Sequence, residues 1–360
     1  MGSIKQNYAN NVLTDGKFDA TDLDGVIPNT NINDNSIDNI TVFGTAGAGI
    51  PSVASDPPSP ALGDVWFNST SNVLKYTGVS TAGAWATGNN MNTARGTLGG
   101  AGTQTAGLAF GGDDGPGANI PATEEYNGSA WTSNPTGLNT ARRALAGCGT
   151  QTAGLAFGGY TTVDVGATEE YDGSTWASNP TGLSTVRRFL AGCGTQTAAL
   201  AIGGGPPFTG ATEEYDGSTW TAGGSLATAR ASSGGAGIQT AGLCIGGENP
   251  SPSALTEEYD GSTWTAGGNL NTSRRVLAAA GIQTAALAFG GNTTVVQSAT
   301  EEYDGSTWTS VNSMNTARQQ LAGAGTQTAA LGFGGFPPAT AATEEWLGAG
   351  APTTVTITAS

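Results

Sequence analysis

Short apolar runs alternate with glycine-rich or polar turns along most of the chain, and one stretch shows the repeating unit. Between Arg274 and Trp308, the segments that favour strands are 276–280, 285–289, 300–303 and 307–309. A Gly-Gly pair closes the second segment, and Asp304-Gly305, a dipeptide typical of tight hairpins, follows the third. Four short strands in a unit of about 44 residues predict one small antiparallel sheet.

The same unit recurs six times in phase, and each copy carries a tryptophan, an arginine, a Gly-Gly pair and a Glu-Glu pair. The tryptophans are Trp85, Trp131, Trp176, Trp220, Trp264 and Trp308, at spacings of 46, 45, 44, 44 and 44 residues. The Gly-Gly pairs stand at 111–112, 158–159, 203–204, 246–247, 290–291 and 334–335. Four strands in every copy of a unit of this length are typical of the blades of a β-propeller.

The order of these markers also carries a family resemblance. A glycine pair that closes the second strand, followed by a tyrosine and then a tryptophan, resembles the kelch repeat over roughly residues 76–346. The resemblance implies one four-stranded blade per repeat. The predicted fold is therefore all-β: a six-bladed kelch-like β-propeller with an extended N-terminal arm.

Two ways of closing the ring remain open from the sequence. The last repeat has three clear strands, and the segment around Trp85 could supply the fourth, which would join both ends of the chain in one blade. Alternatively, residues 353–358 supply that strand and residues 65–85 begin a partial seventh blade. Six blades are favoured, because the arginines that recur once in each repeat, the Gly-Gly pairs and the Glu-Glu pairs each number six.

The first 60 residues are polar, with isolated apolar side chains that cannot form a core of their own. We interpret residues 1–60 as an attachment arm ending in a proline-rich linker, 61–90 as a β-hairpin module that closes the ring, and 91–360 as the propeller. A leader without fixed structure is the alternative for the arm. The arm residues expected to contact a partner are Tyr8, Phe18, Leu23, Ile27, Ile32, Ile37 and Ile40.

Comparing the repeats with one another shows where they differ. The segment between the Gly-Gly pair and the next Thr-Glu-Glu holds 10, 8, 7, 8, 8 and 7 residues of unrelated sequence. In a four-stranded blade, this loop and the connection to the next blade open on the same face. Variable loops on a rigid scaffold commonly bind partners, with neutral drift as the alternative. The receptor-binding candidates are Asp113, Asp114, Asn119, Tyr160, Asp164, Phe208, Glu248, Asn249, Asn292 and Phe336.

Composition and charge disfavour several classes of function. The 360 residues include no histidine, which removes imidazole zinc ligands, Ser-His-Asp triads and histidine bases. The net charge of −16 disfavours nucleic acid and anionic membranes as partners. No signal peptide and no apolar run that could cross a bilayer is visible. We expect folding in a reducing cytoplasm, with Cys148, Cys193 and Cys244 as buried side chains.

The repeated glutamates and arginines suggest a structural role. Adjacent strand residues point to opposite faces, so the first glutamate of each pair faces a neighbouring blade. A buried carboxylate there needs a partner, and one arginine per repeat can supply it. The predicted inter-blade residues are Arg95, Arg142, Arg187, Arg230, Arg274 and Arg318, with Glu124, Glu169, Glu213, Glu257, Glu301 and Glu344.

Catalytic and metal chemistry find little support in the sequence. Residues 171–176 resemble the aspartate-box turn of sialidases with one residue missing, and in that family the box is structural. A copper centre of the galactose-oxidase type would require histidines. Asp113-Asp114 offers two carboxylates, too few to assign calcium. We therefore expect no enzyme activity, no cofactor and no metal.

Two segments resemble virion structural proteins of tailed phages, particularly marine cyanophages. Residues 10–39 resemble their N-terminal arms, and residues 63–68 with 74–76 resemble a short hairpin module of phage fibres. The resemblance implies a virion protein assembled in the bacterial cytoplasm. Its arm would bind other virion proteins, and its propeller would bind a host-surface glycan or protein; a homo-oligomer is compatible with this. The alternatives are a capsid decoration protein and an intracellular kelch-type adaptor.

Overall fold

The computed structural model describes residues 51–58, 64–79, 82–115, 117–349 and 352–357. The chain divides into two compact units, one made of residues 1–81 with 350–360 and the other of residues 82–349. The described residues form strands and no helix, so the predicted all-β class is confirmed, and none of them belongs to a helix able to span a membrane. The predicted arm contacts lie outside the described residues: Tyr8, Phe18, Leu23, Ile27, Ile32, Ile37 and Ile40.

The described part of the larger unit contains six four-stranded antiparallel sheets. The first contains β5 (Gly99–Gly102), β6 (Gly107–Phe110), β7 (Thr123–Tyr126) and β8 (Trp131–Asn134). The second contains β9 (Ala146–Thr150), β10 (Ala153–Phe157), β11 (Thr168–Tyr171) and β12 (Trp176–Asn179). The third contains β13 (Ala191–Thr195), β14 (Ala198–Ile202), β15 (Thr212–Tyr215) and β16 (Trp220–Ala222).

The remaining three sheets follow the same order along the chain. The fourth contains β17 (Gly234–Ile238), β18 (Ala241–Ile245), β19 (Thr256–Tyr259) and β20 (Trp264–Ala266). The fifth contains β21 (Ala278–Ile282), β22 (Ala285–Phe289), β23 (Thr300–Tyr303) and β24 (Trp308–Val311). The sixth contains β25 (Ala322–Gly325), β26 (Ala329–Phe333), β27 (Thr343–Leu347) and, from the start of the unit, β4 (Ala84–Gly88).

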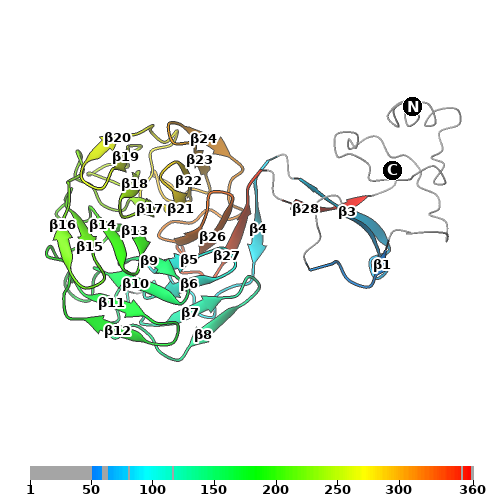
Figure 1. Cartoon of the computed structure of the whole chain (residues 1–360), viewed down its shortest axis with the longest axis horizontal. Coiled ribbons are helices and arrows are strands. Elements are labelled where there is room, and N and C mark those ends of the chain that lie inside the picture. The colour runs from blue at the N-terminus through cyan, green and yellow to red at the C-terminus, as the bar shows by residue number, and fades with distance from the viewer. Residues whose placement is uncertain (1–50, 59–63, 80–81, 116, 350–351, 358–360) are drawn as a thin grey trace, which may run out of the picture. The chain divides into compact units, whose positions relative to one another are not determined.

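Figure 1 shows these sheets arranged radially around one centre, with the first strand of each sheet innermost. The first strands β5, β9, β13, β17, β21 and β25 contact one another in succession, and β25 contacts β5. The series therefore closes on itself. Repeated four-stranded antiparallel sheets in this arrangement are consistent with a β-propeller.

The two ends of the larger unit meet in the sixth sheet. Strand β4 pairs with β27 so that Trp85 lies opposite Trp346, with ring centroids 5.5 Å apart. Residues 353–357, the alternative source of this strand, instead belong to β28 (Pro352–Ile357), which pairs with β3 (Val73–Val79). The larger unit comprises residues 82–349, whereas residues 91–360 were expected. The expectation that the segment around Trp85 supplies the fourth strand of the last repeat is confirmed.

The smaller unit is built around a hairpin of β2 (Val65–Asn68) and β3, with β1 (Ser52–Val53) beside β2 and β28 beside β3. Its best-connected side chain is Asp56, which accepts hydrogen bonds from Lys75 Nζ at 2.6 Å, Asn68 Nδ2 at 2.7 Å and Trp66 Nε1 at 3.1 Å. These bonds, with that from Lys75 the strongest, lower the pKa of Asp56 to about 2. The carboxylate ties the segment after β1 to both strands of the hairpin.

Neighbouring sheets of the larger unit are joined by the same side-chain contacts around the ring. The indole of Trp176 donates to Thr123 Oγ1 of the preceding sheet at 2.8 Å. Gln151 donates to the carbonyl oxygens of Gly107 and Tyr126 at 3.0 and 2.6 Å. The tryptophans that donate to a threonine of the preceding sheet are Trp85, Trp131, Trp176, Trp220, Trp264 and Trp308. The glutamines that donate to carbonyl oxygens of the preceding sheet are Gln104, Gln151, Gln196, Gln239, Gln283 and Gln327.

The turns between third and fourth strands contain four aspartates of one geometry. Asp260 accepts hydrogen bonds from the amides of Thr263 and Ser262 and from both their hydroxyls, and these bonds, that from the Thr263 amide foremost, lower its pKa to about 2. Asp172, Asp216 and Asp304 have the same partners and a pKa of about 2. Asn127 makes the equivalent bonds in the first sheet, so a neutral amide fits this turn.

We predict that the protein loses stability between about pH 4, where aspartates of an unfolded chain titrate, and about pH 2. A depressed pKa in the folded state contributes stability above the unfolded pKa, and this contribution disappears as the pH falls through the folded value. Urea unfolding from pH 5 to pH 2 measures the loss. A variant with asparagine at all four positions should show a flatter dependence on pH, and an unchanged slope would contradict the assignment.

Candidate functional site

Each repeat contains one buried ion pair between the predicted arginine and the first glutamate. Arg142 lies in the segment between β8 and β9, Glu169 lies in β11 of the second sheet, and their side chains are 0% and 1% exposed. In all six pairs the arginine lies in the segment that leads into a sheet, and the glutamate lies in the third strand of that sheet. The pairs therefore join each sheet to its connection with the preceding sheet and do not link strands of two sheets. The arginine precedes the first strand and the glutamate begins the third. Because both strands start at the same end of the sheet, the two side chains meet there.

The ion pair fixes the connection between sheets. Glu257 accepts a hydrogen bond from the amide of Ala227 at 2.7 Å, and Arg230 donates to the carbonyl oxygens of Gly246 at 2.9 Å and Thr228 at 3.2 Å. The connecting segment is thereby attached to both the third strand and the Gly-Gly turn. The amide bond to the glutamate recurs in all six repeats, and five of the arginines donate to the first glycine carbonyl of the Gly-Gly pair. The residues that follow each arginine therefore start from a fixed position.

Two residues after each arginine, a ring of backbone hydrogen bonds surrounds the centre of the sheets. Each amide donates to the carbonyl of the equivalent residue in the preceding repeat, and the Thr97 amide donates to Gln320, at N–O distances of 2.8 to 2.9 Å. We call the six members of this ring the axial residues. They are Thr97, Ala144, Phe189, Ser232, Val276 and Gln320.

All six axial residues have positive φ angles, between 49° and 59°. In the described residues, Asn72 is the one other non-glycine residue with positive φ, whereas 26 glycines adopt it. This backbone region costs an L-residue roughly 1–2 kcal/mol, and more for β-branched side chains such as Thr97 and Val276. A chain with 58 glycines thus places none at the six positions where glycine would relieve strain. Retained strain of this kind is a reason to look for function there.

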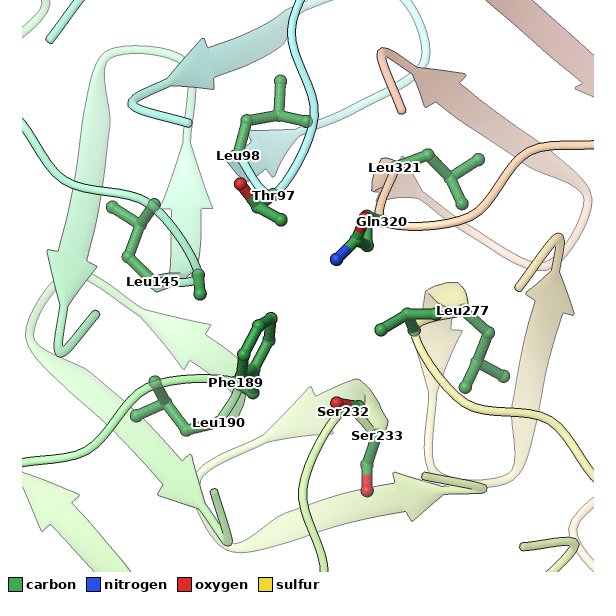
Figure 2. A pocket seen from close by; sticks show the side chains of 12 residues that line it. Thr97, Leu98, Leu145, Phe189, Leu190, Ser232, Ser233, Leu277, Gln320 and Leu321 are labelled. Atoms are coloured by element: carbon green, nitrogen blue, oxygen red, sulfur yellow. The ribbon is translucent and has the colours of Figure 1, made fainter. Parts of the chain in front are cut away.

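The axial residues line an open cavity of about 110 Å³ together with the residues that follow them. Figure 2 shows the side chains of Thr97, Phe189, Ser232 and Gln320 around the opening, with Phe189 across from Gln320. The residues that follow the axial residues are Leu98, Leu145, Leu190, Ser233, Leu277 and Leu321. Figure 2 shows the leucine side chains directed away from the opening, and each belongs to a hydrophobic cluster of the sheets. The side chains that face the opening are therefore those of the axial residues.

The variable loops surround this cavity. The residue after each repeat's arginine forms backbone hydrogen bonds with the residue after the Gly-Gly pair, as between Arg143 and Tyr160 or between Ala231 and Glu248. The axial residues, their preceding neighbours and the loops between second and third strands therefore lie at one end of the sheets. We call this end the variable face.

Most of the ten predicted receptor-binding residues are held by contacts within this face. Asp113 and Asn119 contact Arg143, Asp164 pairs with Arg188, and Glu248 pairs with Arg275. Asn292 bonds to the backbone of Arg275, Phe336 packs over Gly96, and the partly buried Phe208 follows the third Gly-Gly pair. Asp114 and Asn249 are exposed. The predicted loops are thus brought together at one end, but several members serve as supports rather than free contact groups.

The ring of Tyr160 packs against two of the arginines that make these contacts. The guanidinium carbons of Arg143 and Arg188 lie 5.0 and 4.4 Å from the centre of the Tyr160 ring. Asp113 and Asp164, from the loops of two successive repeats, pair with these two arginines at 3.4 Å. Burial raises the pKa of Asp113, while Arg143 opposes the shift. Cation–π contacts and ion pairs together hold the loops of two successive repeats, and the segment of the third repeat that carries Arg188, beside the cavity.

Sequence reasoning missed the axial residues and the arginines that precede them. A signal was present in the otherwise uniform stretch from the repeat arginine to the Gly-Gly pair: the second position after the arginine differs in all six copies, and the first position is an arginine in three of them. Arg143, Arg188 and Arg275 occupy the first of these positions. The stretch from the arginine to the Gly-Gly pair has the same length in every repeat, whereas the loops between second and third strands differ in length and are easier to recognise as variable.

Comparison with known proteins was made against family models and curated sequences. Neither gives a match. Within the described residues, no cluster of three or more acidic or cysteine side chains could hold a metal ion. The three cysteines are buried, and burial raises their pKa values. The account of function therefore depends on the geometry of the variable face.

We predict that the buried and the exposed ion pairs differ strongly in their effect on stability. Replacing Arg230 by leucine strands the Glu257 carboxylate in the interior and should cost about 3–5 kcal/mol. Replacing Arg275, whose side chain is 41% exposed, should cost less than about 1 kcal/mol. Equilibrium unfolding in urea gives both values. Equal losses would show that the repeat ion pair does not hold the connection.

A second prediction concerns strain in the axial ring. Val276→Gly removes a β-branched side chain at a φ of 49°, so the free energy of unfolding should rise by about 1 kcal/mol despite the greater freedom of the unfolded chain. Val276→Ala removes most of the side chain but keeps the strain, and serves as the matched control. Urea unfolding of the two variants should rank glycine above alanine, and the reverse order would contradict the positive φ.

Proposed function

We propose that this chain is a structural protein of a tailed-phage virion, a fibre or spike subunit that binds a host-surface receptor through the variable face. The observation that carries the proposal is the division between constant and variable residues. Contacts that join and brace the sheets recur with the same residue types, whereas the residues around the axial cavity differ from repeat to repeat. A rigid scaffold with variable residues gathered at one end is the usual design of a recognition protein.

We further propose that the larger unit is a six-bladed kelch-like propeller. Three features support this number: six four-stranded sheets, contact between β25 and β5, and a ring of six amide hydrogen bonds that returns to Thr97. A seventh blade beginning at residues 65–85 has less support. In the smaller unit β2 pairs with β3 and β3 pairs with β28, and β4 completes the sixth sheet.

Attachment to the particle is assigned to residues 1–60. The support is the polar sequence with isolated isoleucines and its resemblance to the arms of phage virion proteins. A segment that cannot form its own core can order against another protein. The net charge of −16 fits a partner other than nucleic acid or an anionic membrane. Catalysis is not part of the proposal, because the described variable face offers braced ion pairs and neutral side chains rather than an acid–base pair.

Electron cryo-microscopy of purified particles, with an antibody fragment bound to this protein, tests the proposal. We expect the label at a fibre end or at the tail tip. Uniform labelling of the capsid would favour a decoration protein and contradict receptor binding. Absence from particles that contain their full set of other structural proteins would reject the virion assignment and favour the intracellular adaptor.

A further inference from the structure

We propose that the axial cavity binds one neutral sugar residue, such as the terminal hexose of a surface glycan. The inference deepens the proposed receptor-binding function and rests on it. It assigns the chemical class of the ligand and the place where it binds, which is the centre of the variable face rather than the loop tips. Strain, charge and the arrangement of side chains around the cavity support it.

Strain identifies the positions that carry function. The six axial residues share one backbone conformation and one hydrogen-bond ring, so their side chains are not needed to hold the ring together. Glycine would satisfy the same backbone at lower cost. Six different side chains are nevertheless present, and all six line the cavity. Their common property is their position around the opening, which indicates that the side chains serve a bound group.

Charge excludes several ligand classes. The residues that line the cavity are threonine, serine, glutamine, alanine, valine, leucine and phenylalanine, and none is charged. The charged groups beside the cavity are paired with one another outside the lining: Asp113 with Arg143, and Glu248 with Arg275. The guanidinium carbon of Arg188 lies 5.8 Å from the centre of the Phe189 ring, and this arginine is paired with Asp164. A bound carboxylate, phosphate or ammonium would therefore leave water without a partner of opposite charge, at high cost. The occupant must be neutral.

The arrangement of side chains favours a sugar over an apolar group. Because the axial residues follow one another around a closed ring, those three places apart face each other. Phe189 thus faces Gln320, as Figure 2 shows, and Thr97 faces Ser232. Within the described part of the chain, the Gln320 amide makes no side-chain hydrogen bond, so it can both donate and accept. The hydroxyl of Thr97 donates to Gly96 and that of Ser232 to Glu248, which leaves their oxygens free to accept.

A pyranose matches this pattern on both sides. One face of the ring carries C–H groups with slight positive charge, which pack against the negative face of an aromatic ring such as that of Phe189. Its hydroxyl groups point outward and can bond to the amide of Gln320 and the oxygens of Thr97 and Ser232. A purely apolar ligand would leave the amide of Gln320 unpaired in a closed site.

Saturation-transfer NMR on the full chain tests this inference. The probes are the methyl glycosides of glucose, galactose, mannose, fucose, rhamnose and N-acetylglucosamine, with N-acetylneuraminic acid as the charged sugar and N-acetylphenylalaninamide as a mimic of a peptide side chain. We expect transfer to at least one neutral glycoside and none to the charged sugar. Binding of the peptide mimic or of the charged sugar alone would overturn the proposal, as would the absence of transfer to every neutral glycoside.

Two variants locate the binding. Phe189→Gly removes the stacking surface while suiting the φ of 52°, so it should fold and weaken glycoside binding at least tenfold. Ile238→Thr is the control, because Ile238 lies at the turn between β17 and β18, at the opposite end of the sheets, where four other repeats carry threonine. Undiminished binding in Phe189→Gly would place the sugar elsewhere and reject the axial site. Particle labelling is independent of this assay, so either proposal can fail alone.

Discussion

The close approach of the six first strands around one axis is the constraint on which the rest of the larger unit depends. A Cβ atom at Gly235 would lie 2.6 Å from the carbonyl oxygen of Gly192, and one at Gly323 would lie 2.8 Å from that of Ala279. Both distances are shorter than real Cβ atoms show, so a side chain at either position would push neighbouring strands apart. Glycine keeps the strands close enough for the axial amides to reach the next carbonyl around the ring.

Around this narrow centre, the residues that hold the sheets together are different from the residues that we propose bind a partner. The buried arginine–glutamate pair, the tryptophan–threonine bond and the glutamine bonds recur in each repeat and need no contribution from the variable face. Side chains on that face can therefore differ without altering the ring. The contact between the fifth and sixth sheets shows one departure from this pattern. Trp346 stands where the other repeats have tyrosine, and among the described residues its indole nitrogen has no hydrogen-bond partner.

The strands were predictable because their signals are local. Gly-Gly pairs and Asp-Gly turns limit each segment, and the predicted runs 285–289 and 300–303 coincide with β22 and β23. The burial of the repeat arginines was predictable from their number and spacing. The pairing of each arginine with the glutamate of its own repeat was not predictable, because it depends on the first and third strands of a sheet starting at the same end. The axial ring was also missed, since no local pattern marks a positive φ in residues as different as Phe189 and Gln320.

Hydrogen exchange of individual amides tests the closed ring most directly. The amides of the six axial residues should exchange slowly and at one common rate, because each bond in the ring breaks only when the sheets separate. Amides in the exposed turns between third and fourth strands, such as that of Gly261, should exchange much faster. If the Thr97 amide exchanged rapidly while the other five stayed protected, the ring would be open between the sixth and first sheets, and the account of a closed scaffold around an axial site would be wrong.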